Sequence, residues 1–261
     1  MKNTYTETLK NLMDAESFAK LEALGNDKLH AFVMDSAGLC KPDKIIVCDD
    51  SESDIAMLRH MAIDNVDERP LAMDGHTVHF DGYTTAKISD QGRDPSVTKY
   101  LLPSGMELGK RLNSMDRAEG LAENRGYFNG AMQGRTMLVR FFSLGPTDSP
   151  FSINCAQITD SAYVAHSEDM LYRPGYEQFR KLGDSPEFFR FLHATGPVDE
   201  RGCSSDTDHK RVYMDITEEM VLSVNTQYAG NTVGLKKLAL RLAIRKADRE
   251  GWLAEHMFVM G

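Results

Sequence analysis

The sequence predicts an α/β fold in which a mixed sheet is flanked by helices, with an α+β arrangement as the alternative. Short apolar runs bounded by turn residues occur among longer segments whose apolar residues recur every three or four positions. The chain has 261 residues, of which 41% are hydrophobic, so it can bury one large core or two modest ones. It contains no internal repeat and no low-complexity segment.

The first part of the chain is predicted to be helical and then rich in turns. Residues 5–38 carry apolar side chains at a spacing that would bury one side of a helix. Residues 44–48 form a short apolar strand, and Ser51 in the following turn can cap the next helix. The polar stretch after that helix contains two short strands, at residues 77–80 and 98–102.

The middle of the chain mixes both types of element. Residues 107–124 have a helical pattern, and residues 135–144 form the clearest strand, which a Gly-Pro pair ends. A helical pattern over residues 168–182 is interrupted by the Pro-Gly pair at 174–175. A serine followed by proline then predicts the start of a helix over residues 186–192.

The last part of the chain is predicted to contain strands, a turn and one long helix. Residues 211–215 and 220–225 are strands that lead into a small-residue turn. Residues 234–250 have apolar side chains at helical spacing, and Gly251 can end this helix. Residues 256–260 then have the composition of a buried strand.

Charge and composition exclude several classes of protein. The net charge of −9 argues against non-specific nucleic-acid binding, which needs a basic surface. The four cysteines contain no Cys-x-x-Cys pair, so neither a zinc knuckle nor a disulfide framework is indicated. No apolar run approaches transmembrane length, and the N-terminus lacks the apolar segment of a signal peptide. We therefore expect a cytoplasmic protein without membrane or nucleic-acid partners.

Groups with distinct chemistry gather at the two ends of the last predicted helix. Tyr228 leads a turn that contains Gly230 and Asn231, and the turn runs into a pair of lysines. His256 follows the helix, four residues after the only tryptophan. A phenol edge, an accessible backbone turn, an amine and an imidazole together suit a bound metal and a small anion. The alternative interpretation is a solvated lysine pair and a buried, hydrogen-bonded histidine.

Four segments, in order along the chain, resemble motifs of one enzyme family. They are Val-Cys-Asp-Asp-Ser-Glu at residues 47–52, the strand and turn at 134–150, Ile-Thr-Asp-Ser-Ala-Tyr-Val at 158–164, and Tyr-Ala-Gly-Asn with Lys-Lys and Gly-Trp-Leu-Ala-Glu-His between 228 and 256. The resemblance is to GTP-dependent phosphoenolpyruvate carboxykinase, and it covers residues 44–261. It implies that residues 1–261 form the N-terminal, substrate-binding domain of such an enzyme.

The same resemblance shows what we expect to be absent. The chain contains no Gly-x-x-x-x-Gly-Lys-Ser/Thr loop, and the nearest imitation, at residues 105–111, has the wrong gap and ends in arginine. The C-terminal nucleotide-binding kinase domain is therefore expected to be missing, and the chain alone to be inactive. The alternatives are a non-catalytic binding module, or a subunit that needs a separate kinase-domain chain.

The resemblance also implies which residues bind the substrate. In such an enzyme, oxaloacetate and GTP become phosphoenolpyruvate, GDP and carbon dioxide, a step of gluconeogenesis. Arg93 would hold the substrate carboxylate with its rigid guanidinium fork, which a lysine does not reproduce. Tyr228 would line the carboxylate or carbon dioxide position, and Gly230 and Asn231 would present backbone and amide groups. Ala229 replaces a glycine of the family, so its Cβ is expected to crowd the ligand.

The implied metal is Mn²⁺, or Mg²⁺, and GTP is the co-substrate through the missing half. The metal would stabilise the enolate formed on decarboxylation, with His256 and one lysine as ligands. A gapless match through to His256 selects Lys236, whereas matching the lysine pair alone selects Lys237. We prefer Lys236, and we expect Tyr228, Lys236 and His256 to lie on one side of a cleft with Arg93 facing them.

Overall fold

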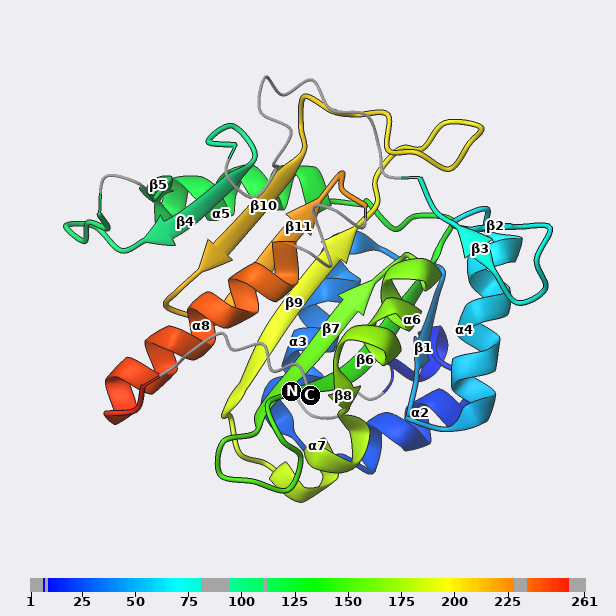
Figure 1. Ribbon diagram of the computed structural model, residues 1–261, viewed down its shortest axis with the longest axis horizontal. Helices are drawn as coiled ribbons and strands as arrows, with labels where there is room; N and C mark the ends of the chain where they lie inside the picture. Colours follow the sequence, from blue (N-terminus) through cyan, green and yellow to red (C-terminus); the bar gives the residue numbers. More distant parts are fainter. Residues whose placement is uncertain (1–6, 8, 81–93, 110–111, 228–233, 254–261) are drawn as a thin grey trace.

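The computed structural model describes residues 7, 9–80, 94–109, 112–227 and 234–253. It confirms the predicted α/β class, with one mixed nine-stranded sheet flanked by helices (Figure 1). The strand order is β1-β6-β7-β9-β11-β10-β4-β5, and the short β8 also pairs with β6. The strands are β1 Lys44–Val47, β4 Thr98–Leu102, β5 Ser114–Asp116, β6 Thr136–Leu144, β7 Ile153–Thr159, β8 Arg173–Pro174, β9 Phe188–Ala194, β10 Arg211–Asp215 and β11 Met220–Val224.

Helices cover both faces of this sheet. In Figure 1, α6 and α8 lie in front of the strands and α3 and α5 lie behind them. The helices are α2 Ala15–Glu22, α3 Asp27–Cys40, α4 Glu52–Asp64, α5 Arg117–Phe128, α6 Ala162–Leu171, α7 Tyr176–Leu182 and α8 Gly234–Glu250. A small second sheet pairs β2 Arg69–Pro70 with β3 Thr77–Val78. None of the described helices is long and apolar enough to cross a membrane.

The core is built on both faces because side chains alternate along each strand. On β6, Val139 and Phe141 belong to the same buried cluster as Phe32 of α3. Phe142, the next residue, instead belongs to the cluster that contains Leu242 of α8. The central strands are therefore apolar on both sides, as expected for strands covered by helices front and back.

Local capping signals correct two of the predicted helices. Residues 5–38 do not form one helix, because Asp14 and Asn26 each cap a new one with their side chains. Between them, α2 ends at Glu22, and Gly25 has a φ of 57°, a left-handed conformation that favours glycine. Likewise, the helix predicted at 107–124 starts only at α5, where the Asp116 carboxylate accepts the amides of the first turn.

The helix predicted over residues 186–192 is wrong, because residues 188–192 belong to strand β9. The Ser-Pro pair resembles the start of a helix, but Phe188, Phe189 and Phe191 are all buried in the middle of the sheet. β9 pairs in parallel with β7 on one side and β11 on the other, and these partners override the local pattern. The sequence also did not reveal β7.

Other predictions were correct. The strand at β6 is present, Ser51 caps α4 by accepting from the amide of Asp54, and α8 has the predicted bounds. The helical pattern over 168–182 is broken at the Pro-Gly pair as predicted, into α6 and α7. Gly175 is needed there, because a Cβ would lie 2.3 Å from the backbone nitrogen of Phe142. The strand predicted at residues 256–260 lies outside the described residues.

Candidate active site

Three parallel strands in the centre of the sheet end side by side. β7 pairs with β9 and β9 with β11, so Thr159, Ala194 and Val224 end their strands at one edge, which we term the carboxyl edge. β6 runs antiparallel to β7 and therefore begins there, directly after Arg135. In open α/β sheets, ligands bind in the crevice outside the carboxyl ends of the strands.

An ion pair joins the ends of these strands. Arg135 Nη1 lies 2.8 Å from Oδ2 of Asp160, the residue that follows β7. Arg135 Nη2 donates to the carbonyl oxygen of Gly196 at 2.8 Å, beyond the end of β9. The Oδ1 atom of Asp160 accepts from the amide of Thr195 at 2.8 Å and from its hydroxyl at 3.0 Å. Both charged groups thus hold the edge together, through partners that are distant in the sequence.

The chain that leaves β11 is held by a second set of contacts. Gln227 is buried, and its Oε1 accepts from the amide of Ser204 at 3.0 Å while its Nε2 donates to the carbonyl of Gly202. The hydroxyl of Ser204 donates to the carbonyl of Thr195 at 3.0 Å. Gln227 directly precedes Tyr228, so the residues before the predicted substrate turn are tied to the loop after β9.

The strand that follows Arg93 begins at the same edge. β4 runs parallel to β10, and β10 runs antiparallel to β11. Thr98 lies opposite Val212, which lies opposite Ser223, so the start of β4 is two strand spacings, about 10 Å, from β11. Asp94, the first described residue after Arg93, is buried. Both flanks of the predicted substrate residues are therefore at the carboxyl edge.

Helix α8 starts near this edge and crosses the front of the sheet (Figure 1). Leu242 is buried in the cluster that contains Phe142 and Phe189, whereas Arg241 and Arg245 are exposed. The predicted apolar spacing of this helix thus fits its buried side at Leu242, and the two arginines lie on its exposed side. The first turn of a helix has amides without partners in the helix, and these favour an anion.

One protein family matches most of the chain. Its model covers residues 31–248 and is described as the phosphoenolpyruvate carboxykinase N-terminal domain. The chain belongs to this family. The resemblance noted in the sequence is thereby confirmed.

Relatives extend the match to almost the whole chain. The enzyme named phosphoenolpyruvate carboxykinase [GTP] from Thermococcus kodakarensis is 50% identical over 254 residues, which are 97% of this chain and 40% of the relative. The enzyme of the same name from Pyrococcus furiosus is 47% identical over 100% of this chain and 41% of the relative. That from Saccharolobus solfataricus is 40% identical over 97% of this chain and 39% of the relative. The chain thus spans about two fifths of the length of these curated relatives.

In this phosphoenolpyruvate carboxykinase N-terminal domain, most of the predicted site residues lie outside the described part. They are Arg93, Tyr228, Ala229, Gly230, Asn231 and His256. Lys236 and Lys237 are in the first turn of α8, but their side chains are not among those described. The preference for Lys236 over Lys237 as metal ligand therefore stays a prediction. The arrangement of the site residues around one cleft stays a prediction too.

The described part of the domain offers no alternative metal centre. No group of three His, Cys, Asp or Glu side chains among the described residues could hold a metal ion. The predicted metal ligands, one of the two lysines and His256, thus have no competing cluster among the described residues. Two nitrogen ligands are an incomplete set for a manganese-type ion, which prefers mainly oxygen.

Proposed function

We propose that this chain supplies the substrate-binding part of a GTP-dependent phosphoenolpyruvate carboxykinase. The proposed reaction converts oxaloacetate and GTP to phosphoenolpyruvate, GDP and carbon dioxide, in the cytoplasm and in gluconeogenesis. The observation that carries the proposal is the family match over residues 31–248, together with 50% identity to a relative named for this activity. A non-catalytic binding module is the alternative.

The substrate is proposed to bind at the carboxyl edge, between Arg93 and the turn that Tyr228 leads. Asp94 and Gln227 support this, because both are buried, Asp94 before the start of β4 and Gln227 after the end of β11. At that edge the two strands are two strand spacings, about 10 Å, apart. An arginine side chain spans much of such a gap and can form two parallel hydrogen bonds with a carboxylate. Gly230 and Asn231 would then contact the far end of a small dicarboxylate.

A divalent cation, Mn²⁺ or Mg²⁺, is proposed to bind beside the substrate. When bound, such an ion stabilises negative charge on an oxygen of the substrate. Lys236 and His256 would be its ligands from this chain, with the amine and the imidazole both neutral. The cation itself favours the neutral amine, because a positive charge nearby lowers the pKa of a lysine.

GTP is proposed to bind to a part of the enzyme that corresponds to the unmatched three fifths of the relatives. The 261 residues contain no Gly-x-x-x-x-Gly-Lys-Ser/Thr loop, the usual cradle for the phosphates of GTP. The relatives are about two and a half times as long as the matched portion, which leaves room for such a unit. It would be either a continuation of this chain or a separate kinase-domain chain.

A chimaera tests the proposal. The matched two fifths of the Thermococcus kodakarensis enzyme are replaced by this chain, and phosphoenolpyruvate formation from oxaloacetate and GTP is measured with Mn²⁺. We expect turnover by the chimaera, none by the 261 residues alone, and none by the chimaera carrying Arg93→Ala. A folded chimaera that binds oxalate but does not turn over would favour the binding module instead.

A further inference from the structure

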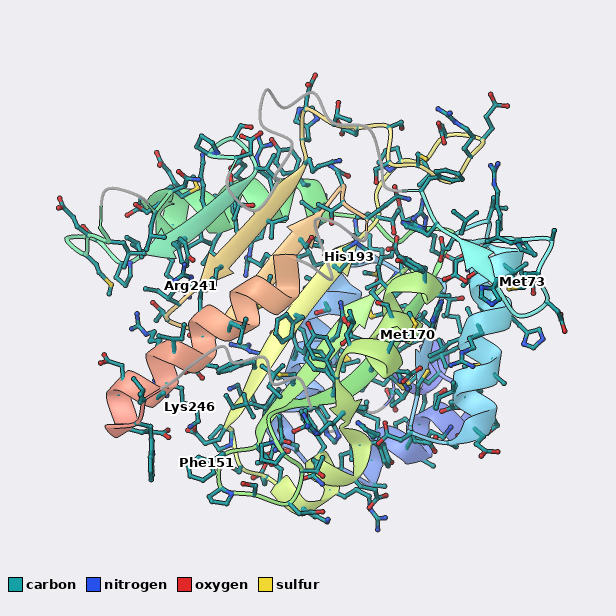
Figure 2. All side chains as sticks on the ribbon, viewed as in Figure 1. Met73, Phe151, Met170, His193, Arg241 and Lys246 are labelled. Atoms are coloured by element: carbon teal, nitrogen blue, oxygen red, sulfur yellow. The ribbon has the colours of Figure 1, made fainter. Side chains whose placement is uncertain are left out.

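A buried histidine contacts the chain two residues before the predicted substrate turn. His193 is on the front face of β9 near the carboxyl edge, where Figure 2 labels it, and it is completely buried. Its Nε2 lies 3.0 Å from the carbonyl oxygen of Thr226, beyond the end of β11. Its Nδ1 lies 2.7 Å from Oγ1 of Thr159 at the end of β7. The ring therefore connects the ends of three strands.

The partners determine which nitrogen carries the proton. A carbonyl oxygen only accepts, so the Nε2–H of His193 must donate to Thr226, and Nδ1 is left to accept from the hydroxyl of Thr159. The Thr159 oxygen in turn accepts from the amide of Ser161 at 3.0 Å. Burial lowers the pKa of His193, which agrees with a neutral ring. The donor and the acceptor of each of these three hydrogen bonds are thus determined.

Further contacts hold the same short segment. The amide of Asn225 donates to the carbonyl of Ala194 at 2.9 Å, although Asn225 has a φ of 55°. The hydroxyls of Ser223 and Thr226 are 2.5 Å apart. Together with the Gln227 contacts, these bonds hold the chain from the end of β11 to the residue before Tyr228. Among these contacts, His193 supplies the only side-chain bond to the Thr226 carbonyl in the described part of the chain.

We infer that His193 is a positioning residue for the substrate site, acting through the Thr226 carbonyl to direct the chain into the turn led by Tyr228. This inference rests on the proposed function. A small substrate that is held by several groups at once tolerates little displacement of any of them. A change at His193 should therefore alter ligand binding even where the fold remains.

Two substitutions separate positioning from a purely structural role. Gln at position 193 places an amide donor near the Nε2 position, so His193→Gln keeps the bond to Thr226 and loses the one to Thr159. Asn places its amide near the Nδ1 position, so His193→Asn keeps the bond to Thr159 and loses the one to Thr226. Each variant loses one buried hydrogen bond, so the two should unfold at similar temperatures.

The first readout is the affinity of the chain for oxalate with Mn²⁺, measured by calorimetry. We expect His193→Asn to weaken binding about tenfold or more, and His193→Gln to stay within about threefold of the unchanged protein. Equal weakening by both variants, or by neither, would overturn the inference.

The second readout needs no ligand. We expect the backbone amide signals of residues 228–231 to shift in the NMR spectrum of His193→Asn and to keep their positions in His193→Gln. Equal shifts in both variants would overturn the inference. If the unchanged protein binds no oxalate, the proposed function fails in this chain, and the amide signals alone decide the role of His193.

Discussion

The carboxylate of Asp67 caps helix α6 by accepting, through Oδ2, from the backbone amide of Ala162 at 2.9 Å. The same oxygen accepts from the hydroxyl of Ser161 at 3.2 Å and from the amide of Tyr163 at 3.3 Å. Burial nevertheless dominates and raises the pKa of Asp67 to about 6, with the charge of Asp160 adding to the effect. The segment before the small sheet is thus joined to α6 by a carboxyl group that titrates near neutrality.

The raised pKa predicts how stability changes with pH. The neutral form is favoured in the folded state, so the contribution of Asp67 is fully present below its unfolded pKa of about 3.9 and is lost as the pH rises through about 6. Asp67→Asn keeps an acceptor and does not titrate. We expect this variant to gain on the order of 2 kcal/mol relative to the unchanged protein between pH 4 and pH 7.5 in urea unfolding.

Asp148 provides the control for that measurement. It is exposed, and its hydrogen bond with Lys181 lowers its pKa below the usual 3.8, so its contribution is lost only as the pH falls below that value. Asp148→Asn should therefore show little change relative to the unchanged protein between pH 4 and pH 7.5. A stability difference for Asp67→Asn that does not depend on pH would contradict the prediction.

The ion pair at the carboxyl edge predicts that truncating Asp160 strongly lowers the stability of the fold. Asp160→Ala leaves the Arg135 guanidinium without its carboxylate and the amide of Thr195 without its acceptor. We expect a loss of about 3 kcal/mol in the free energy of unfolding. Glu177→Ala, which removes an exposed pair with Arg180, should cost less than about 1 kcal/mol. Similar costs for the two variants would show that Asp160 does not hold the edge together.

Two glycines predict opposite effects of the same substitution. At Gly175, a Cβ would lie 2.3 Å from the nitrogen and 2.5 Å from the Cα of Phe142, so Gly175→Ala should lower the melting temperature. At Gly38, inside α3, a Cβ would meet no atom within 4 Å. Gly38→Ala should therefore stabilise the protein by about 0.5–1 kcal/mol. Scanning calorimetry checks both, and an unchanged melting temperature for Gly175→Ala would contradict the packing of α7 against β6.

The parts of the fold that were predicted correctly carry their own local signals. Ser51 caps α4, and β6, whose residues are mostly apolar, ends just before a Gly-Pro pair. β9 was mistaken for a helix because Ser185 and Pro186 form a helix-start pattern, while its strand partners lie far away in the sequence. Such partners are not visible in a single local window.

The candidate site likewise has residues that the sequence pointed to and residues that it did not. The motif that contains Tyr228 was found through family resemblance, which a single sequence can carry. The groups that hold the edge, such as Asp160, His193 and Gln227, received no role from the sequence. Their hydrogen-bond partners are 23 to 35 residues away in the chain, so only the arrangement of the strands brings them together.

Substitution of the two neighbouring lysines should affect Mn²⁺ binding differently. If Lys236 is the ligand, Lys236→Ala should abolish Mn²⁺ binding, whereas Lys237→Ala should leave it unchanged. Binding should be weak even in the unchanged protein, because two nitrogen ligands leave the coordination shell incomplete. Mn²⁺ binding by both variants is measured from the electron paramagnetic resonance signal of the free ion. Loss of binding in Lys237→Ala alone would show that the gapless match chose the wrong lysine.

The central claim is that this chain carries the carboxylate-binding part of a phosphoenolpyruvate carboxykinase site. Calorimetric titration of oxalate, with Mn²⁺ present, into the chain and its Arg93→Lys variant tests it most directly. Arg180→Lys, at an exposed position on α7, serves as the control. The account predicts saturable binding that falls at least about tenfold in Arg93→Lys alone, because a lysine does not reproduce the guanidinium fork. No saturable binding by the folded chain, or equal affinity in Arg93→Lys, would contradict it.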